Sequence, residues 1–211
     1  MTKVKICGIT NEEDATWAVN LGAHYVGLNF HKDSPRKVSP DLAARIAKKV
    51  PSFVPTVGVF VEQTAAEIVK IAKKVGLAGV QLHGDHTVAD CETIASELEV
   101  FLIKAVRVGT EADVDALAAY KDAVGYFLLD ARVDGQLGGT GQTFPWELAA
   151  RAKAFKKPIF LAGGLTVENV AQAIEAVQPF AVDVASGVEK SPKRKDFDKM
   201  KQFIEEVKSA F

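Results

Sequence analysis

Two titratable side chains stand at the ends of apolar runs that are far apart in the sequence. Cys7 closes the run 4–7, and Asp130 closes the run 126–130. Each run is typical of a β-strand, so each side chain falls where a strand gives way to a loop. If the two strands are parallel and share one sheet, the thiol and the carboxyl group meet at one rim. A base and an acid placed together in this way would suit an enzyme that moves protons.

These two roles require opposite shifts of pKa. Cys7 reacts as a thiolate, so its pKa must fall, which a nearby cation or a helix N-terminus achieves. Asp130 donates a proton near neutral pH only if partial desolvation raises its pKa. The alternative for Cys7 is a small buried apolar side chain, the usual setting of a free cysteine. Cys91, between Asp90 and Glu92, is assigned to helix packing.

Strand-like and helix-like segments alternate along the chain. The helix-like segments repeat apolar residues at the spacing of one helix face, as at Ile68, Ala72 and Val75. The strand-like runs are apolar at nearly every residue, as expected when both faces of a sheet are covered. Eight such units, about 26 residues apart, favour an α/β fold, a closed (β/α)8 barrel that forms a single domain over residues 1–211. The predicted strands are 4–7, 25–30, 54–60, 79–82, 101–106, 126–130, 158–162 and 181–185.

Several helix starts can be predicted from capping patterns. Thr10 with Glu13, and Thr64 with Glu67, have the spacing of a capping box. Ser39 followed by proline predicts an N-cap with proline at the first helical position. Pro145 is expected to open the sixth helix in the same way.

The active site of such a barrel lies at the C-terminal rim of its strands. Glycine-rich loops follow the seventh and eighth predicted strands, where barrels often bind phosphate on backbone N–H groups. The same glycines are also common in tight turns, and a third glycine-rich segment, 138–141, follows the sixth strand. The predicted phosphate contacts are Gly163, Gly164, Ser186 and Gly187.

Two further side chains on this rim suit a second acidic group of a ligand. Arg36, in the loop after the second strand, has a planar guanidinium that matches a carboxylate. His83 ends the fourth strand and can donate a hydrogen bond to the same group. The alternatives are a surface arginine paired with a neighbouring acid and a histidine that packs or binds a loop carbonyl.

The composition narrows the class of partner. The formal net charge of −1 gives no reason to expect nucleic acid. The basic stretch 190–195 is followed by acids and is assigned to a solvated loop. The chain has two cysteines and no spaced Cys/His cluster, so no metal is expected. No apolar run reaches the length of a membrane span or has the form of a signal peptide, so the expected compartment is the cytoplasm.

Taken together, these motifs resemble the phosphoribosylanthranilate isomerases of tryptophan biosynthesis. Lys-Ile-Cys-Gly at 5–8 is specific to that family among sugar-phosphate barrels. Ala185 stands where some relatives have serine, which removes one possible hydrogen bond near the phosphate corner. The segments that carry the resemblance are 3–10, 34–36, 80–84, 128–130, 138–141 with Phe144, 161–165, 182–184 and 186–189.

The resemblance implies an Amadori rearrangement of N-(5-phosphoribosyl)anthranilate to 1-(2-carboxyphenylamino)-1-deoxyribulose 5-phosphate. It implies that Asp130 is the general acid, that Cys7 is the general base, and that Arg36 binds the anthranilate carboxylate. Asp183 is a further implied contact, to a ribose hydroxyl. The family requires no metal, nucleotide or organic cofactor, and its members are monomers or homodimers.

Two other functions remain open at this stage. A histidine-pathway phosphoribosyl isomerase would use the same fold, but that family generally has aspartate at the position of Cys7. A non-catalytic barrel that only binds a phosphorylated ligand would be expected to have lost one of the two titratable groups. Both Cys7 and Asp130 are present.

Overall fold

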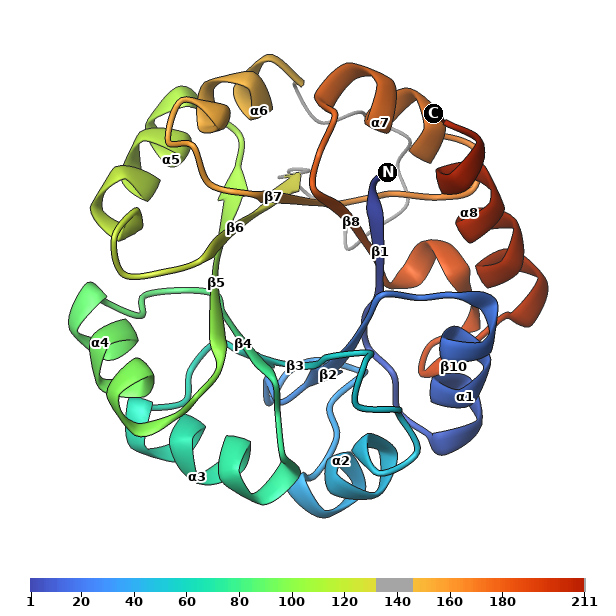
Figure 1. Cartoon of the computed structure of the whole chain (residues 1–211), viewed down its shortest axis with the longest axis horizontal. Coiled ribbons are helices and arrows are strands. Elements are labelled where there is room, and N and C mark those ends of the chain that lie inside the picture. The colour runs from blue at the N-terminus through green and yellow to red at the C-terminus, as the bar shows by residue number, and fades with distance from the viewer. Residues whose placement is uncertain (132–145, 211) are drawn as a thin grey trace.

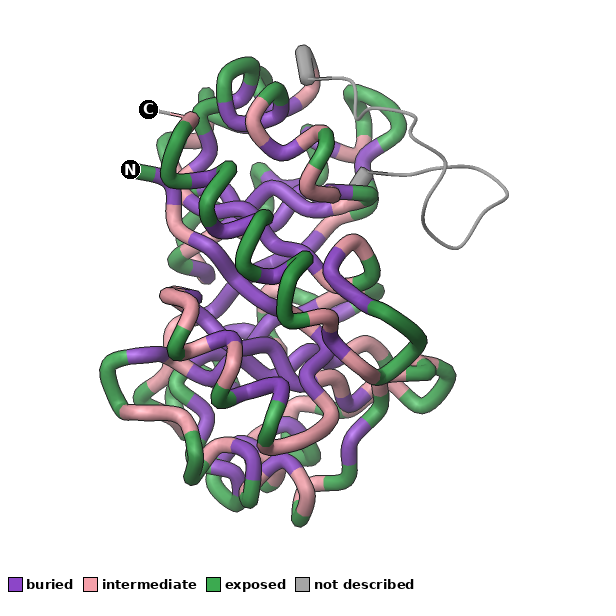
Figure 2. Tube along the Cα trace, turned by 90° about the vertical axis from the view of Figure 1, so that its right-hand side faces the viewer, coloured by how far each residue is buried: buried purple, intermediate pink, exposed green. Residues whose placement is uncertain are grey.

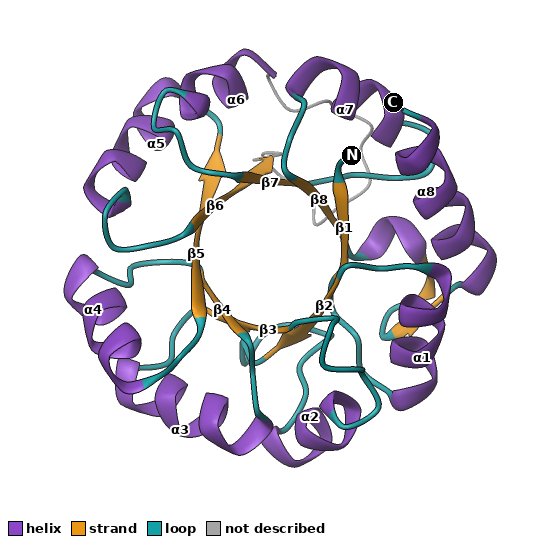
Figure 3. Cartoon of the chain, in the orientation of Figure 1, coloured by secondary structure: helices purple, strands orange, loops and turns teal. Residues whose placement is uncertain are grey.

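Eight parallel strands close into a barrel inside a ring of helices (Figures 1 and 3). The computed structural model describes residues 1–131 and 146–210. The strands pair in chain order, and β1 pairs with β8 to complete the closure. The predicted (β/α)8 fold is therefore confirmed, and the predicted strands agree with the observed ones to within a few residues. The strands are β1 (Lys3–Ile6), β2 (Tyr25–Asn29), β3 (Thr56–Phe60), β4 (Gly79–Leu82), β5 (Phe101–Val108), β6 (Tyr126–Ala131), β7 (Ile159–Ala162) and β8 (Ala181–Val184).

The strands are buried on both faces, which explains their continuous apolar sequence (Figure 2). Side chains that point outward pack against the helices, whereas those that point inward fill the barrel. Aromatic rings pack edge to face at the N-terminal end of the barrel, for example Tyr25 against Phe160, with ring centroids 5.3 Å apart. Phe101 and Tyr126, each the first residue of its strand, join this cluster. The barrel floor is therefore filled, and polar side chains are left to the opposite rim.

The outer layer consists of amphipathic helices. In α3, Ile68, Ala72 and Val75 are buried, as their spacing predicts. A short antiparallel pair, β9 (Glu189–Ser191) and β10 (Arg194–Lys195), lies between β8 and the last helix. The helices are α1 (Glu12–Leu21), α2 (Pro40–Ala47), α3 (Ala65–Val75), α4 (Val88–Glu97), α5 (Glu111–Asp115), α6 (Trp146–Lys153), α7 (Val170–Val177) and α8 (Phe197–Ser209), with 3-10 turns at Ala116–Tyr120 and Ser186–Val188.

The structure corrects the assignment of residues 190–195 to a solvated loop. Lys195 is fully buried, and its backbone N–H donates a hydrogen bond to Asp14. Its ammonium donates hydrogen bonds to the carbonyl of Ala185 and to Glu189. A run of basic residues predicts a solvated loop, but the sequence does not reveal that buried hydrogen-bond acceptors surround Lys195.

The capping predictions give mixed results. Ser39 and Thr64 cap α2 and α3 as expected, and Thr64 forms its capping box with Glu67. The capping box of Thr10 with Glu13 is wrong, because the N-cap of α1 is Asn11, whose side-chain oxygen accepts from the N–H of Asp14 at 2.8 Å. The hydroxyl of Thr10 instead donates to the carbonyl of Lys193. Pro145 and the segment 138–141 lie outside the described residues.

Replacing Asn11 by alanine should lower the free energy of unfolding by about 1 kcal/mol, because the first turn of α1 loses its side-chain cap. Thr10→Ala is the matched control and should cost less, since Thr10 makes only an exposed hydrogen bond. Urea unfolding of both variants measures the difference. An equal or larger loss at Thr10 would contradict the observed cap.

Candidate functional site

A cavity of about 550 Å³ opens at the C-terminal rim of the barrel. Its wall is built from the ends of strands on all sides of the barrel and from the loops that follow them. Every residue predicted for the site lines this cavity except Gly187. The predicted residues in the wall are Cys7, Arg36, His83, Asp130, Gly163, Gly164, Asp183 and Ser186.

Gly187 has a different position from the one expected. A Cβ atom at this residue would lie 2.0 Å from the carbonyl oxygen of Leu165. Glycine is therefore needed for the loops after β7 and β8 to approach each other. Gly187 acts through backbone packing between these two loops, and it is not part of the cavity wall.

The loop after β7 has the backbone that an anion site requires. Gly163 and Gly164 adopt positive φ angles of 89° and 64°, which strongly favour glycine. Asn169 holds this loop by accepting from the N–H of Thr166 and donating to the carbonyl of Gly164. The loop is thus fixed before a ligand arrives, with its small residues facing the cavity.

Cys7 is positioned by the closure of the barrel. Its backbone N–H donates to the carbonyl of Val184 on β8 at 2.8 Å. On the other side, a Cβ at Gly27 would lie 2.7 Å from the sulfur, so glycine in β2 leaves room for the thiol. The side chain is half-buried and faces the cavity.

Lys5, which contacts the wall residue Asp183, was missed by the sequence analysis. It is fully buried, and its ammonium donates a hydrogen bond to Asp183 Oδ1 at 3.0 Å. Cys7 directly follows β1 and continues its pairing with β8, so Lys5 and Cys7, two residues apart in extended chain, point to the same face. The available signal was a lysine inside an otherwise apolar strand, two residues before the reactive thiol.

The electrostatic surroundings of Cys7 differ from the prediction. Burial raises the pKa of the thiol, and the negative charge of Asp183 raises it further, whereas Lys5 lowers it. The net pKa lies above the ordinary value, so the expected lowered pKa is wrong. The sequence suggested a cation near Cys7 without revealing that an anion and a dry environment accompany it.

Asp130 lies in the environment expected of an acid. Burial and the nearby charge of Asp183 raise its pKa to about 6, against opposing effects of Arg107 and Lys5. Arg107 is its neighbour on β5, in register across the sheet. Desolvation therefore outweighs two cations, and the predicted upward shift of the pKa is confirmed.

Arg36 is held by a carboxylate distant in sequence. Its Nε and Nη2 atoms donate to the two oxygens of Glu189, both at 2.7 Å. Glu189 also accepts from the buried ammonium of Lys195 at 3.1 Å. The fork therefore has one edge bound to the protein, and its remaining N–H groups are available to a second acceptor. Glu189 and Lys195 were not predicted as part of the site.

His83 is neutral in the structure, because burial and nearby cations lower its pKa to about 3. Gln81 Nε2 lies 2.6 Å from His83 Nε2. With the amide assigned in this orientation, His83 Nε2 accepts and the ring proton is on Nδ1. Gln81 Oε1 is buried and has no hydrogen-bond partner among the described residues. Gln81, another residue that the prediction missed, thus brings an unused acceptor to the cavity wall.

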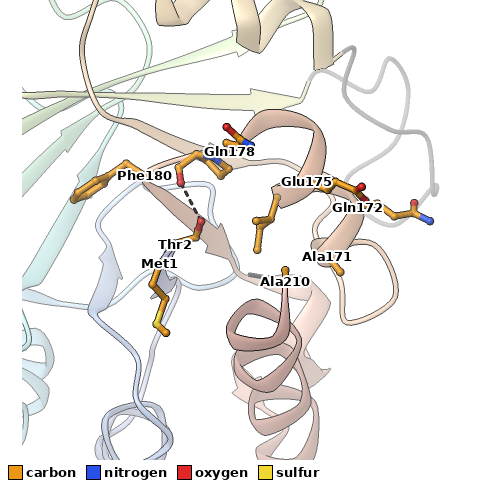
Figure 4. Close-up of a pocket in the computed structure, with 10 residues that line it drawn as sticks. Met1, Thr2, Ala171, Gln172, Glu175, Gln178, Phe180 and Ala210 are labelled. Carbon is orange, nitrogen blue, oxygen red and sulfur yellow. Dashed lines mark hydrogen bonds between the residues drawn. The ribbon is translucent and has the colours of Figure 1, made fainter.

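A second cavity, of about 760 Å³, lies near the two termini (Figure 4). Its wall includes Met1, Thr2, Glu175, Phe180 and Ala210. Thr2 donates to the carbonyl of Pro179 at 3.1 Å. Among the described residues that line it, Glu175 is the only one with a titratable side chain. Within the described residues no group of His, Cys, Asp and Glu could hold a metal ion, and no helix is long and apolar enough to cross a membrane.

The fold and the rim together have the arrangement of a (β/α)8 enzyme whose active site lies at the C-terminal ends of its strands. A thiol and a carboxylic acid of raised pKa share one cavity with an arginine and a neutral histidine. Such a site can remove a proton from one atom of a ligand and give one to another.

Comparison with known proteins gives the particular family. Residues 4–206 match the family model of N-(5'-phosphoribosyl)anthranilate isomerase. The chain is 46% identical to the enzyme of that name from Trichlorobacter lovleyi, over the full length of both chains. The chain therefore belongs to the N-(5'-phosphoribosyl)anthranilate isomerases, which act in tryptophan biosynthesis.

Two solved structures support the assignment. The first shows monomers generated from the dimeric enzyme of Thermotoga maritima. It is 42% identical, with a TM-score of 0.88, and the match covers 99% of this chain and 100% of that one. The second is a phosphoribosyl anthranilate isomerase in complex with reduced 1-(o-carboxyphenylamino)-1-deoxyribulose 5-phosphate. Its sequence identity, TM-score and coverage are the same as those of the first.

The raised pKa of Asp130 has a measurable effect on stability. Its folded-state pKa, about 6, lies above that of the unfolded chain, so ionisation of Asp130 destabilises the native state at pH 8. Asp130→Asn should therefore stabilise the protein there by up to about 3 kcal/mol. The gain should shrink as the pH falls below 6 and vanish below about 4, where both states are protonated.

Urea unfolding as a function of pH measures this gain. Asp115→Asn is the control, because the hydrogen bond from Arg151 lowers the pKa of Asp115. Its replacement should reduce stability at neutral pH. A gain at Asp130 that did not depend on pH would contradict the assigned environment.

Proposed function

We propose that Cys7 is the general base and Asp130 the general acid of the rearrangement. Asp130 protonates the furanose ring oxygen while the lone pair of the aniline nitrogen opens the ring to an iminium. The Cys7 thiolate then removes the proton from C2, and the C–H electron pair forms the C1–C2 double bond of an enolamine. Tautomerisation of the enolamine gives the ketone product. The observation that carries these roles is the shared cavity, in which the pKa of Asp130 is about 6.

The remaining wall residues are proposed to bind the two ends of the substrate. The phosphate would lie on the backbone of Gly163 and Gly164 with Ser186. The anthranilate carboxylate would accept from the free N–H groups of Arg36, and His83 would donate through Nδ1. Asp183 would contact a ribose hydroxyl with its second carboxylate oxygen. Holding both ends in place supplies the part of the acceleration that acid–base chemistry does not.

Cys7→Ala and Asp130→Asn should each lower kcat by roughly 10²–10⁴-fold, the usual contribution of one general acid or base. Binding of the reduced product analogue should change little, because its main anchors remain. Steady-state kinetics and calorimetric titration measure the two quantities. Cys91→Ala is the control, since that thiol is buried away from the cavity. Near-normal turnover of Cys7→Ala would refute the role of Cys7 as the base, and near-normal turnover of Asp130→Asn would refute that of Asp130 as the acid.

The rival functions are tested with the unaltered protein. Turnover of the histidine-pathway intermediate, compared with that of phosphoribosylanthranilate, measures any second activity. Rescue of a tryptophan auxotroph that lacks the isomerase separates an enzyme from a barrel that only binds. Each proposed step is a proton transfer, so we propose that no cofactor takes part. We also propose a cytoplasmic location and a single domain over residues 1–211.

For the oligomeric state, we propose a homodimer formed through the N-terminal faces of two barrels. The T. maritima relative is described as dimeric. In this chain Met1 and Phe53 are 82% and 80% exposed, and they precede β1 and β3, so both belong to the N-terminal face. The cavity of Figure 4, which Met1 helps to line, lies on the same face. Exposed apolar side chains beside a hollow are typical of an association surface.

Light scattering at micromolar concentration should give twice the mass of one chain. Phe53→Ser should shift the equilibrium toward the monomer, because it removes the most exposed aromatic ring of this face. Phe197→Ser is the control, since Phe197 packs on Trp17 on the outer helices. A monomeric wild-type protein would rule out the dimer.

A further inference from the structure

Lys5 carries a charge in a place where charges are costly. Its side chain is fully buried inside the barrel, and moving an ammonium out of water costs several kcal/mol unless partners compensate. The ammonium has one carboxylate partner, Asp183 Oδ1 at 3.0 Å. Burial lowers the pKa of Lys5, but Asp183 and Cys7 raise it more, and the net pKa lies above the ordinary value. Lys5 is therefore protonated.

Another buried lysine, Lys104, has no carboxylate partner of this kind among the described residues. Lys104 donates to the carbonyl oxygens of Gly84 and His86, and its ammonium lies 4.6 Å from the centroid of the Tyr120 ring. Lys104 thus holds a loop outside the barrel. Lys5 holds no loop. Its other charged neighbour is Cys7, and the opposite charges of the ammonium and the thiolate favour the charged form of each, so that each shifts the pKa of the other in that direction.

We propose that Lys5 is a positioning residue of the reaction, whose ammonium pairs with the Cys7 thiolate and holds it toward C2 of the substrate. The inference rests on the proposed role of Cys7 as the base. The neighbours on one strand point to one face, and Asp183 fixes the ammonium from the adjacent strand β8. The arrangement explains why a lysine is buried in the barrel interior next to the cavity wall.

Lys5 transfers no proton when Cys7 deprotonates C2 of the substrate. The thiolate takes the C2 proton and becomes a neutral thiol, while the C–H electron pair forms the double bond and neutralises the iminium nitrogen. Lys5 keeps its proton and its bond to Asp183. The other charged groups around Cys7 are Arg36 from the loop after β2 and Lys195 from β10. Asp130 lies on β6 in the same cavity wall.

The test is the titration of the Cys7 thiol in the full chain. With Cys91→Ala as background, Cys7 is the only cysteine, and its rate of alkylation by iodoacetamide can be followed against pH. Lys5→Met should raise the thiol pKa by about one unit or more, the order of shift expected when a neighbouring opposite charge is lost. The alkaline limb of kcat/KM should move by the same amount. Lys5→Arg, which keeps the charge, should restore most of the shift.

Lys104→Met is the matched control, a buried lysine whose loss should lower stability and leave the thiol titration unchanged. An unchanged titration in folded Lys5→Met would overturn the inference. If Lys5→Met does not fold, Lys5→Gln provides the second test, because its uncharged amide can still donate a hydrogen bond to Asp183. Lys5→Gln should raise the thiol pKa as Lys5→Met does. An unchanged titration in folded Lys5→Gln would overturn the inference.

These outcomes also separate the inference from the proposed function. If Cys7→Ala remains active, Cys7 is not the base, and the proposed function fails independently of Lys5. If Cys7→Ala is inactive but the thiol titration is the same with and without Lys5, only the positioning role of Lys5 is refuted.

Discussion

The pairing of β1 with β8 closes the barrel, and the site depends on this closure. In that register Lys5 lies opposite Asp183, and the N–H of Cys7 continues the ladder by donating to Val184. Residues from the first and last strands, which are 178 positions apart, therefore form one ion pair beside the thiol. A slip of one residue would turn each side chain to the opposite face of its strand. The closure of the sheet thus fixes the chemistry as well as the fold.

The two proposed catalytic groups share one electrostatic problem. Both are taken out of water, and Asp183 contributes negative charge to both. The effect favours the neutral form in each case, which suits Asp130 as an acid and opposes Cys7 as a base. Cations oppose this effect at both groups: Lys5 and Lys195 lower the pKa of the thiol, and Arg107 and Lys5 lower that of Asp130. The charge of Asp183 therefore supports the proposed role of Asp130 as an acid, whereas the proposed role of Cys7 as a base requires a nearby cation.

Rigidity on the binding side comes from contacts that are themselves distant in sequence. Glu189 orients Arg36 with two hydrogen bonds, and Lys195 neutralises the carboxylate from behind. Breaking such a buried pair is costly because the remaining charge loses its partner. At the opposite end the aromatic floor is packed and carries none of this chemistry. Stability and function are thus largely assigned to different ends of the barrel.

The amino-acid sequence by itself determined the alternation of strands and helices, the closed barrel and the rim on which Cys7 and Asp130 meet. These features follow from local periodicity and from the rule that barrel strands place their C-terminal ends together. The family motifs also pointed to Arg36, His83 and the glycine loops. Local patterns succeeded at the Ser39 and Thr64 caps. At α1 two adjacent residues could cap the helix, and in the structure Asn11 does so while Thr10 donates to the distant Lys193.

Only the tertiary structure decided the sign of the Cys7 shift, the partner of Arg36, the burial of Lys5 and Lys195, and the packing role of Gly187. Each of these depends on which charge or backbone atom lies within a few ångströms across the barrel. Electrostatic energies change steeply with that distance and with exclusion of water, and neither quantity is encoded by the spacing of residues along the chain.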